Sequence, residues 1–297
     1  MILTRNSHIQ SFLDYLRFEK RYSQHTVISY QNDLEQFVAY LSIFGELKPG
    51  EISSSFIRSW LAELKAEGIT AKSINRKIST LKSFFKFLMK QSVIEQTPMT
   101  TITSPKISKR LPSFVEEKNT STLFSHVEFG NDWTGKTDRL ILLLFYSTGM
   151  RLSELINLKE KQIDADYSQI KVLGKGNKER IIPVSNALLV EIKNYILQKP
   201  VKLDEVSQVF VNDKGKPLYP KYIYNTVKKY LSNVTTLEKK SPHVLRHTFA
   251  THLMNNGADL NAVKELLGHS SLAATQVYTH NTIEKLKDIH KRAHPKA

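Results

Sequence analysis

The sequence predicts a mainly α-helical protein of two domains, with a small β-sheet in the second domain. Three observations lead to this fold class. The first hundred residues repeat apolar side chains at helical spacing. Residues 97–113 are polar, contain three prolines and lose that spacing, which indicates a linker. Further on, two β-rich segments flank the sequence GKGN at residues 174–177, which is typical of a hairpin turn. We therefore expect domains at residues 1–100 and 113–297, joined by a linker at 101–112.

The N-terminal domain is expected to be a bundle of four helices. Apolar spacing predicts helices over residues 8–21, from residue 23 or 25 to 41, 53–66 and 71–90. Glycine or proline residues follow the second and third helices and end them.

The fourth of these helices is predicted to carry basic side chains on its outer face. Acidic residues are absent from 71–93, whereas ordinary exposed helix faces mix both signs. This pattern favours a helix that follows DNA phosphates over a merely solvated surface. The predicted DNA-binding residues are Lys72, Arg76, Lys77, Lys82 and Lys86 on this helix and Lys106, Lys109 and Arg110 in the linker.

The second domain is expected to combine helices with one hairpin. Its predicted strands cover residues 169–173 and 180–184, on either side of the turn. Its predicted helices cover residues 137–147, 151–158, 186–198, 220–232, 242–256, 259–267 and 271–280, and a short tail helix covers 283–292.

Composition indicates a polyanionic partner. The chain of 297 residues has 43 basic and 28 acidic residues, a net charge of +15. Residues 1–112 contribute +7 and residues 113–297 contribute +8, which suits two basic bodies that grip DNA from two sides. The chain has no cysteine, which excludes disulfides, cysteine-based zinc sites and thiol nucleophiles. It has no apolar run of membrane-spanning length and no signal-peptide pattern, so we expect a cytoplasmic protein without membrane contact.

The stretch SPHVLRH at residues 241–247 is the most informative for chemistry. Ser241 suits an N-cap and Pro242 the first helical position, so His243 and Arg246 share one helix face near a helix N-terminus. That arrangement can bind a phosphate. In isolation a capping histidine beside a surface arginine would be the commoner interpretation. His243 and His247 have the spacing of a metal pair, but no acidic ligand accompanies them, and we expect no metal site.

Three further segments place polar groups at helix ends or turns. Arg151 follows Gly149 at a helix start, and Glu154 lies one turn later. An ordinary surface pair of this kind contributes under about 1 kcal/mol. Lys175 lies at the hairpin tip, and His269 follows Gly268 at a helix junction. Tyr278 lies nine residues beyond His269, and taken together these groups suit attack of an aromatic oxygen on a phosphodiester.

These motifs resemble those of a known family in order and spacing. TGMRLSEL (148–155), GKGNKER (174–180), SPHVLRHTFATHL (241–253) and LGHSSLAATQVYTH (267–280) resemble the boxes of the tyrosine recombinase, or phage integrase, family. SQHTVISYQNDLEQF (23–37), SINRKISTLKSFFKFL (73–88) and the ending IHKRAHPKA are similar to its Xer subgroup. The resemblance implies a SAM-like core-binding domain followed by a mixed α/β catalytic domain. It also implies the catalytic set Arg151, Lys175, His243, Arg246, His269 and Tyr278, with Glu154 as an accessory acid.

The resemblance further implies a reaction and an assembly. Tyr278 attacks the scissile phosphate of duplex DNA, a 3′-phosphotyrosine forms and a 5′-hydroxyl leaves. His243 accepts the tyrosine proton, and Lys175 protonates the leaving oxygen. Arg151, Arg246 and His269 bind the non-bridging oxygens, and Glu154 orients a catalytic neighbour. Neither metal, ATP nor any other cofactor is expected. The expected partners are duplex DNA with a specific recombination site, three further protomers in a homo- or hetero-tetramer on two DNA sites, and a DNA translocase of the FtsK type. The tail helix would dock on a neighbouring protomer.

Other functions remain open at this point. The role implied by the Xer resemblance is resolution of chromosome dimers, and the nearest alternative is an integrase or resolvase of a mobile element. The core-binding pattern begins within about ten residues of Met1, which disfavours an added arm-binding domain and hence many such integrases. A type IB topoisomerase would share the nucleophile. A non-catalytic DNA-binding architectural protein is the alternative from another class, and the complete set of six residues disfavours it.

Overall fold

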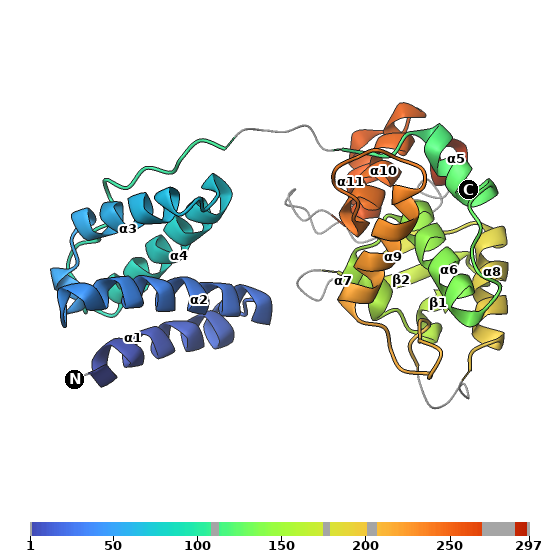
Figure 1. Cartoon of the computed structure of the whole chain (residues 1–297). Helices are drawn as coiled ribbons and strands as arrows, with labels where there is room; N and C mark the ends of the chain where they lie inside the picture. The colour runs from blue at the N-terminus through green and yellow to red at the C-terminus, as the bar shows by residue number, and fades with distance from the viewer. Residues whose placement is uncertain (1, 108–112, 175–178, 201–206, 269–288, 296–297) are drawn as a thin grey trace. The chain divides into compact units, whose positions relative to one another are not determined.

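The computed structural model describes residues 2–107, 113–174, 179–200, 207–268 and 289–295. The chain forms two compact units, residues 1–110 and 111–297, each with its own hydrophobic core (Figure 1). Helices dominate both units, and the second contains a three-stranded sheet. The predicted fold class is therefore confirmed.

The first unit is a bundle of four helices. They are α1 (Ile2–Asp14), α2 (Gln24–Leu41), α3 (Ser54–Ala66) and α4 (Ala71–Lys90). Side chains of Ser23 and Thr70 accept hydrogen bonds from backbone N–H groups in the first turns of α2 and α4, which explains where these helices begin. The first helix starts earlier than predicted and continues into one wider π-helical turn at Tyr15–Glu19.

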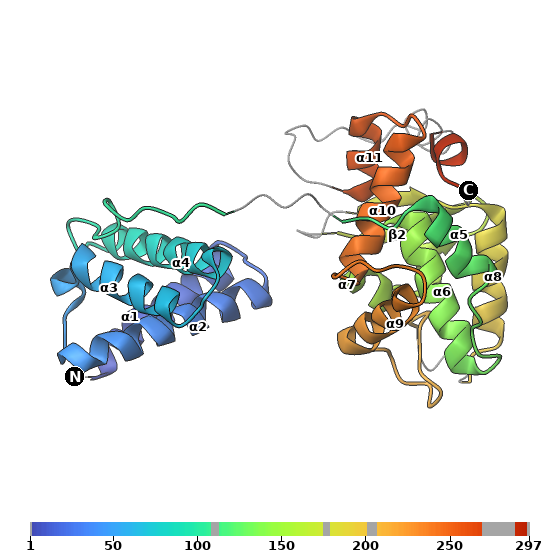
Figure 2. The ribbon, with the colours of Figure 1, turned by 45° about the horizontal axis from the view of Figure 1, so that its top comes forward.

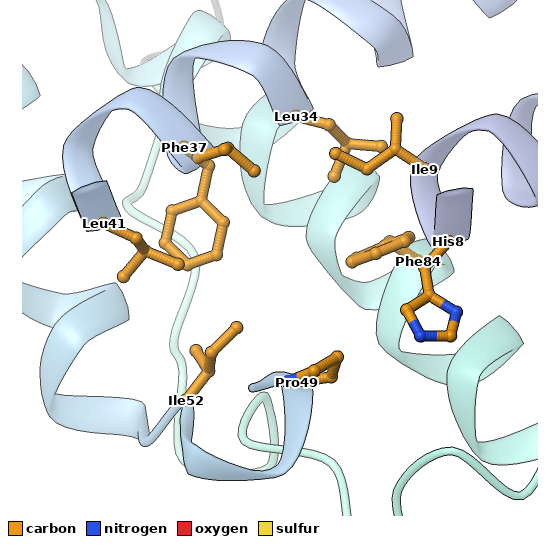
Figure 3. A pocket seen from close by; sticks show the side chains of 9 residues that line it. His8, Ile9, Leu34, Phe37, Leu41, Pro49, Ile52 and Phe84 are labelled. Carbon is orange, nitrogen blue, oxygen red and sulfur yellow. The ribbon is translucent and has the colours of Figure 1, made fainter. Parts of the chain in front are cut away.

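Apolar side chains from all four helices fill the core of this unit, and a small gap remains among some of them. A cavity of about 20 Å³ lies among His8, Ile9, Leu34, Phe37, Leu41, Pro49, Ile52 and Phe84 (Figure 3). Such a volume holds about one water molecule, which needs two or more polar partners. The lining is apolar apart from the histidine ring, so this cavity is a packing gap and not a ligand site.

A group of polar and charged side chains around one buried carboxylate joins α2 to α4, and we call it the Asp33 cluster: Asp33, Gln36, Arg76, Lys77 and Thr80. Both oxygens of the fully buried Asp33 carboxylate accept hydrogen bonds, Oδ1 from Lys77 at 2.9 Å and Oδ2 from Thr80 at 2.8 Å. Arg76 also donates to Oδ2, and Lys77 donates to Gln36. The prediction that Lys77 lies on the outer face of its helix is wrong. Its side chain is buried (4% exposed) because its ammonium group is the partner of a buried carboxylate.

The second unit combines helices with a small sheet. The helices are α5 (Glu117–Ser125), α6 (Trp133–Thr148), α7 (Leu152–Ile156), α8 (Asn186–Leu197), α9 (Pro220–Ser232), α10 (Pro242–Asn255) and α11 (Leu260–Leu267). The strands β1 (Ile163–Asp164), β2 (Gln169–Leu173) and β3 (Glu179–Pro183) pair antiparallel in that order. In the second pairing, Val172 lies opposite Arg180 and Ile170 opposite Ile182. The hairpin is therefore confirmed, with its tip at 175–178 outside the described residues.

Helix α6 is the centre of this unit. Most of its residues are buried, and α8, α9 and α10 all pack against it (Figure 2). It ends at Gly149, whose φ of 58° is left-handed, and the chain then turns into α7. Helix α11 ends in the same way at Gly268, with φ 62°, and packs against β3. The ends of α6 and α11 and the start of α7 are thereby brought to strand β3.

The described part of the tail packs on its own unit. Residues 289–293 are helical. The Nε2 atoms of His290 and His294 lie 2.9 Å from the carbonyl oxygens of Ser147 and Tyr146 at the end of α6. The Nδ2 atom of Asn256 donates to the carbonyl of Ala293. Residues 289–295 therefore contact their own unit in this single chain, and docking of the tail helix on a neighbouring protomer stays an expectation. Among the helices described, none is both long and apolar enough to span a bilayer.

We expect Asp33→Ala to lower the free energy of unfolding of the first unit by about 3–5 kcal/mol, because it leaves the buried ammonium group of Lys77 without its carboxylate. Urea unfolding followed by Trp60 fluorescence, in a Trp133→Phe background, measures this unit, since the chain has only these two tryptophans. The matched control is Asp14→Ala, which removes an exposed pair with Arg17 and costs under about 1 kcal/mol. Equal losses in the two variants would contradict the structural importance of the Asp33 cluster.

Candidate active site

Three guanidinium groups and one carboxylate meet in the second unit, and we call them the arginine cluster: Arg151, Glu154, Arg180 and Arg246. Arg151 directly precedes α7 and Glu154 lies in its first turn. Arg180 comes from β3 and Arg246 from the second turn of α10. Residues up to 95 positions apart in the sequence thus form one site, because α6, α7, β3 and α10 share a core.

The Glu154 carboxylate is the centre of the cluster. Its Oε2 accepts from the backbone N–H of Arg151 at 2.6 Å, and its Oε1 accepts from Nη1 of the same residue at 2.8 Å. Arg180 binds both oxygens in a bidentate pair, with Nη2 at 2.9 Å from Oε2. Bidentate pairs of this kind fix orientation as well as charge. Glu154 therefore ties the start of α7 to strand β3.

The arginines also bind the carbonyl groups that end two helices. Arg246 donates to the carbonyls of Gly149 and Leu267. Nη2 of Arg151 lies 2.8 Å from the Gly268 carbonyl, and Nε of Arg180 lies 3.0 Å from the Leu266 carbonyl. The last carbonyls of a helix lack partners within the helix and carry partial negative charge. Cations are therefore stabilised at the ends of α6 and α11.

Two glycines permit this close approach. At Gly149 a Cβ atom would lie 2.4 Å from Cδ1 of Phe249, and at Gly268 it would lie 2.8 Å from Cδ of Arg180. Both residues have left-handed φ angles, which side chains disfavour. Glycine is required at both positions on two independent grounds.

The electrostatics favour an added anion. Burial raises the pKa of Glu154, but the hydrogen bonds and charges of Arg180 and Arg151 outweigh it, and the net pKa falls below the usual range. Burial, followed by the charges of Arg151 and Arg180, lowers the pKa of Arg246 to about 9. Among the described residues of this site, three guanidinium groups face one carboxylate. A phosphate group bound here would compensate the remaining positive charge.

The structure brings together some of the predicted catalytic residues. Arg151, Glu154 and Arg246 converge as described. His243 lies exposed in the first turn of α10, three residues before Arg246 and on the same side of the helix. Lys175, His269 and Tyr278 lie outside the described residues. His269 follows directly after Gly268, whose carbonyl binds Arg151.

The predicted DNA-binding residues differ in their surroundings. Lys72, Lys82, Lys86 and Lys106 are exposed, and Arg76 is exposed while bound to Asp33. Lys77 is buried, and Lys109 and Arg110 lie outside the described residues. Within the described ranges, no cluster of three or more histidine or acidic side chains could hold a metal ion.

Sequence reasoning missed Arg180, although the motif that contains it was identified. The signal lies in the strand pattern. Arg180 and Ile182 are two residues apart on β3 and both are buried, so they share the inner face of the strand. A charged residue on an inner strand face requires a buried partner, and here that partner is Glu154.

Comparison with known proteins identifies the class. Residues 113–285 match the family described as "Phage integrase family", and residues 9–92 match "Phage integrase, N-terminal SAM-like domain". The chain belongs to this family, that of the tyrosine recombinases, and is a site-specific recombinase.

Particular relatives are similar over nearly the whole chain. Tyrosine recombinase XerC of Staphylococcus carnosus is 40% identical over 292 residues, which cover 97% of each chain. Tyrosine recombinase XerC of Listeria innocua is 38% identical, over 96% of this chain and 97% of that protein. Among solved structures, the XerH site-specific recombinase bound to palindromic difH substrate, a post-cleavage complex, has a TM-score of 0.70. It is 24% identical and covers 95% of this chain and 93% of its own, so it supports the fold.

We expect Gly149→Ala to destabilise the second unit by at least about 1 kcal/mol more than Gly257→Ala. The first substitution adds a clash with Phe249 to the left-handed strain, whereas Gly257 has φ 87° and open space around it. Urea unfolding followed by Trp133 fluorescence in a Trp60→Phe background measures the difference. Equal effects would show that the end of α6 tolerates a side chain.

Proposed function

We propose that this recombinase cuts and rejoins duplex DNA through a 3′-phosphotyrosine bond formed by Tyr278. The observation that supports this most strongly is the arginine cluster at the end of α11. Arg246 of α10 and Arg151, which directly precedes α7, bind the carbonyls of Leu267 and Gly268, directly before the segment that contains His269 and Tyr278. A scissile phosphate bound by these arginines would be held next to the start of that segment.

Arg151 and Arg246 act on the phosphate in this proposal. A guanidinium has five N–H donors, and Arg246 uses two of them for carbonyls in the described part of the chain. The remaining donors suit the equatorial oxygens of the pentavalent transition state. Glu154 acts on Arg151, because it holds both the backbone N–H and one guanidinium nitrogen of that residue.

Proton transfer is assigned to groups around the cluster. A tyrosine has an unperturbed pKa of about 10, so Tyr278 needs a base or a strongly positive site. His243 is the proposed proton acceptor, and its exposed position in the first turn of α10 leaves it accessible to DNA. Lys175 is the proposed donor to the leaving 5′-oxygen, and His269 donates to a non-bridging oxygen. The phosphotyrosine retains the energy of the broken bond, so religation requires no cofactor.

The first unit is proposed to hold the DNA backbone. Lys72, Lys82 and Lys86 are exposed on α4 at spacings that place them on one helix face. Arg76 lies on the same face, and its contact with Asp33 restricts its orientation. Phosphate contacts of this kind position a protein on DNA without reading its sequence.

The biological role proposed is that of an Xer-type recombinase acting on a specific site. Relatives named XerC, 35–40% identical over at least 96% of this chain, support resolution of chromosome dimers over recombination of a mobile element. We further propose a homo- or hetero-tetramer on two DNA sites, with a DNA translocase of the FtsK type as the activating partner.

We expect wild-type protein to become covalently attached to a nicked duplex, whereas Tyr278→Phe protein binds the DNA without attachment. The duplex carries the site recovered by sequencing DNA bound to Tyr278→Phe protein in cells, and denaturing electrophoresis measures the attachment. Tyr167→Phe, which changes an exposed turn residue, is the matched control and should react as wild type does.

Two results would redirect this assignment. Covalent trapping by Tyr278→Phe protein would show that another residue is the nucleophile. Relaxation of any supercoiled plasmid without site preference would favour a type IB topoisomerase.

We expect the triple variant Lys72→Gln/Lys82→Gln/Lys86→Gln to bind DNA with a weaker salt dependence. Each phosphate contact contributes about 0.9 to the slope of log affinity against log salt, so three lost contacts reduce it by about 2.7. Fluorescence anisotropy at several salt concentrations measures the slope. The control Arg17→Gln/Lys20→Gln/Lys48→Gln removes the same charge from exposed positions outside α4. Equal slopes for the two variants would place the DNA elsewhere.

A further inference from the structure

The contact that orients Arg151 also opposes its proposed role. Glu154 binds Arg151 through two hydrogen bonds, and a carboxylate paired with a single guanidinium would cancel the positive charge that attracts a phosphate. Arg151 is the more accessible partner, since its side chain is 26% exposed and that of Glu154 is 2% exposed. An oriented but neutralised arginine would be a poor phosphate ligand.

Arg180 removes this conflict. It is buried, at 4% exposure, and its two terminal nitrogens bind the two oxygens of Glu154. Its third nitrogen donates to the Leu266 carbonyl, so all three nitrogens of the guanidinium are bound to protein acceptors. Arg180 is therefore placed to act on Glu154 and not on DNA.

We infer that Arg180 is a positioning residue that serves as the internal counter-ion of Glu154, so that Glu154 can orient Arg151 without neutralising it. This inference rests on the proposed function for its catalytic consequence. The charge compensation of Glu154 by Arg180 concerns the arginine cluster alone and does not depend on catalysis. With Arg180 present, the charges of Arg151 and Arg246 remain available for a phosphate.

A purely structural role predicts different behaviour. If Arg180 only connected β3 to α7 and α11, removal of Glu154 as well would lower the reaction rate and the phosphate affinity further. If Arg180 is a counter-ion, removal of the carboxylate restores the positive charge available to phosphate. The sign of the coupling between the two positions therefore separates the two roles.

The experiment compares wild type with Arg180→Met, Arg180→Lys, Glu154→Gln and Glu154→Gln/Arg180→Met. Arg139→Met is the matched control, because it removes an arginine from an arginine–glutamate pair of the same unit that joins α6 to α8. The first measurement is the single-turnover rate of covalent attachment to the nicked duplex at saturating protein. The second is DNA affinity in a Tyr278→Phe background.

We expect Arg180→Met to lower the single-turnover rate by about 100-fold, with a change in DNA affinity of under about threefold. Arg180→Lys keeps the charge and should react at least about fivefold faster than Arg180→Met, because one cation still faces the carboxylate. Glu154→Gln/Arg180→Met should likewise react at least about fivefold faster than Arg180→Met. Arg139→Met should react as wild type does.

A third measurement does not depend on catalysis. Inorganic phosphate, added at constant ionic strength, should raise the melting temperature of wild type, and ligand linkage relates this shift to affinity. The shift should fall by at least about half in Arg180→Met and recover in Glu154→Gln/Arg180→Met. If Arg180→Met does not fold, the comparison of Glu154→Gln/Arg180→Met with Glu154→Gln replaces it, and their rates and phosphate shifts should agree within about threefold.

The inference is overturned if Glu154→Gln/Arg180→Met is as slow as Arg180→Met and shows no recovery of the phosphate shift. It is also overturned if Arg180→Met behaves like Arg139→Met, or if the two Glu154→Gln proteins differ by more than about threefold. Failure of the proposed function looks different, because wild type itself would then form no covalent complex. The phosphate shifts would still decide the role of Arg180.

Discussion

The arrangement of the second unit around its candidate site depends on the hydrogen bonds of the buried Glu154 carboxylate. It receives hydrogen bonds from the first residue before α7 and from strand β3, and the same two arginines continue to the carbonyls that end α11. A buried carboxylate with several charge-assisted hydrogen bonds is costly to disturb, because the loss of one partner leaves a buried charge uncompensated. The start of α7, strand β3 and the end of α11 are thereby held together around a site of positive charge.

The two units use the same physical device. In the first unit, the Asp33 carboxylate binds Lys77 inside the bundle and Arg76 at its surface. In the second unit, Glu154 binds Arg180 inside the core and Arg151 at its edge. In each case the buried cation compensates the carboxylate, and the carboxylate orients the outer cation. Each unit thus presents an arginine with restricted freedom, which would reduce the entropy lost if the side chain bound a phosphate, as proposed.

Local rules predicted much of the fold. Helix α4 begins and ends at the predicted residues, because Thr70 caps it and its apolar spacing is regular. The helices predicted to end at residues 147 and 267 end at Thr148 and Leu267, each directly before a glycine with a left-handed φ angle. The π-helical turn after α1 was missed because Tyr15 and Leu16 continue the apolar pattern without any local signal of a wider turn.

The errors in the site have a different physical origin. Lys77 was placed on an outer face because helical periodicity cannot detect a carboxylate 44 residues earlier in the chain. Arg180 was overlooked for the same reason, since its partner is 26 residues away on another element. Arg151, Glu154 and Arg246 were found because each lies in a short sequence motif. Sequence patterns therefore identified the groups proposed for chemistry better than the groups that support them.

The Asp33 cluster has a consequence for evolution. A buried ion pair can be exchanged for apolar side chains of similar volume at little cost, whereas loss of one partner alone leaves a charge stranded in the core. Asp33 and Lys77 should therefore be epistatic. Each single replacement should destabilise the protein, whereas replacement of both by apolar residues should cost little. Arg76 would follow a different course, because its exposed guanidinium can return to water when Asp33 is lost. Divergent descendants of this sequence should thus change positions 33 and 77 together and position 76 independently.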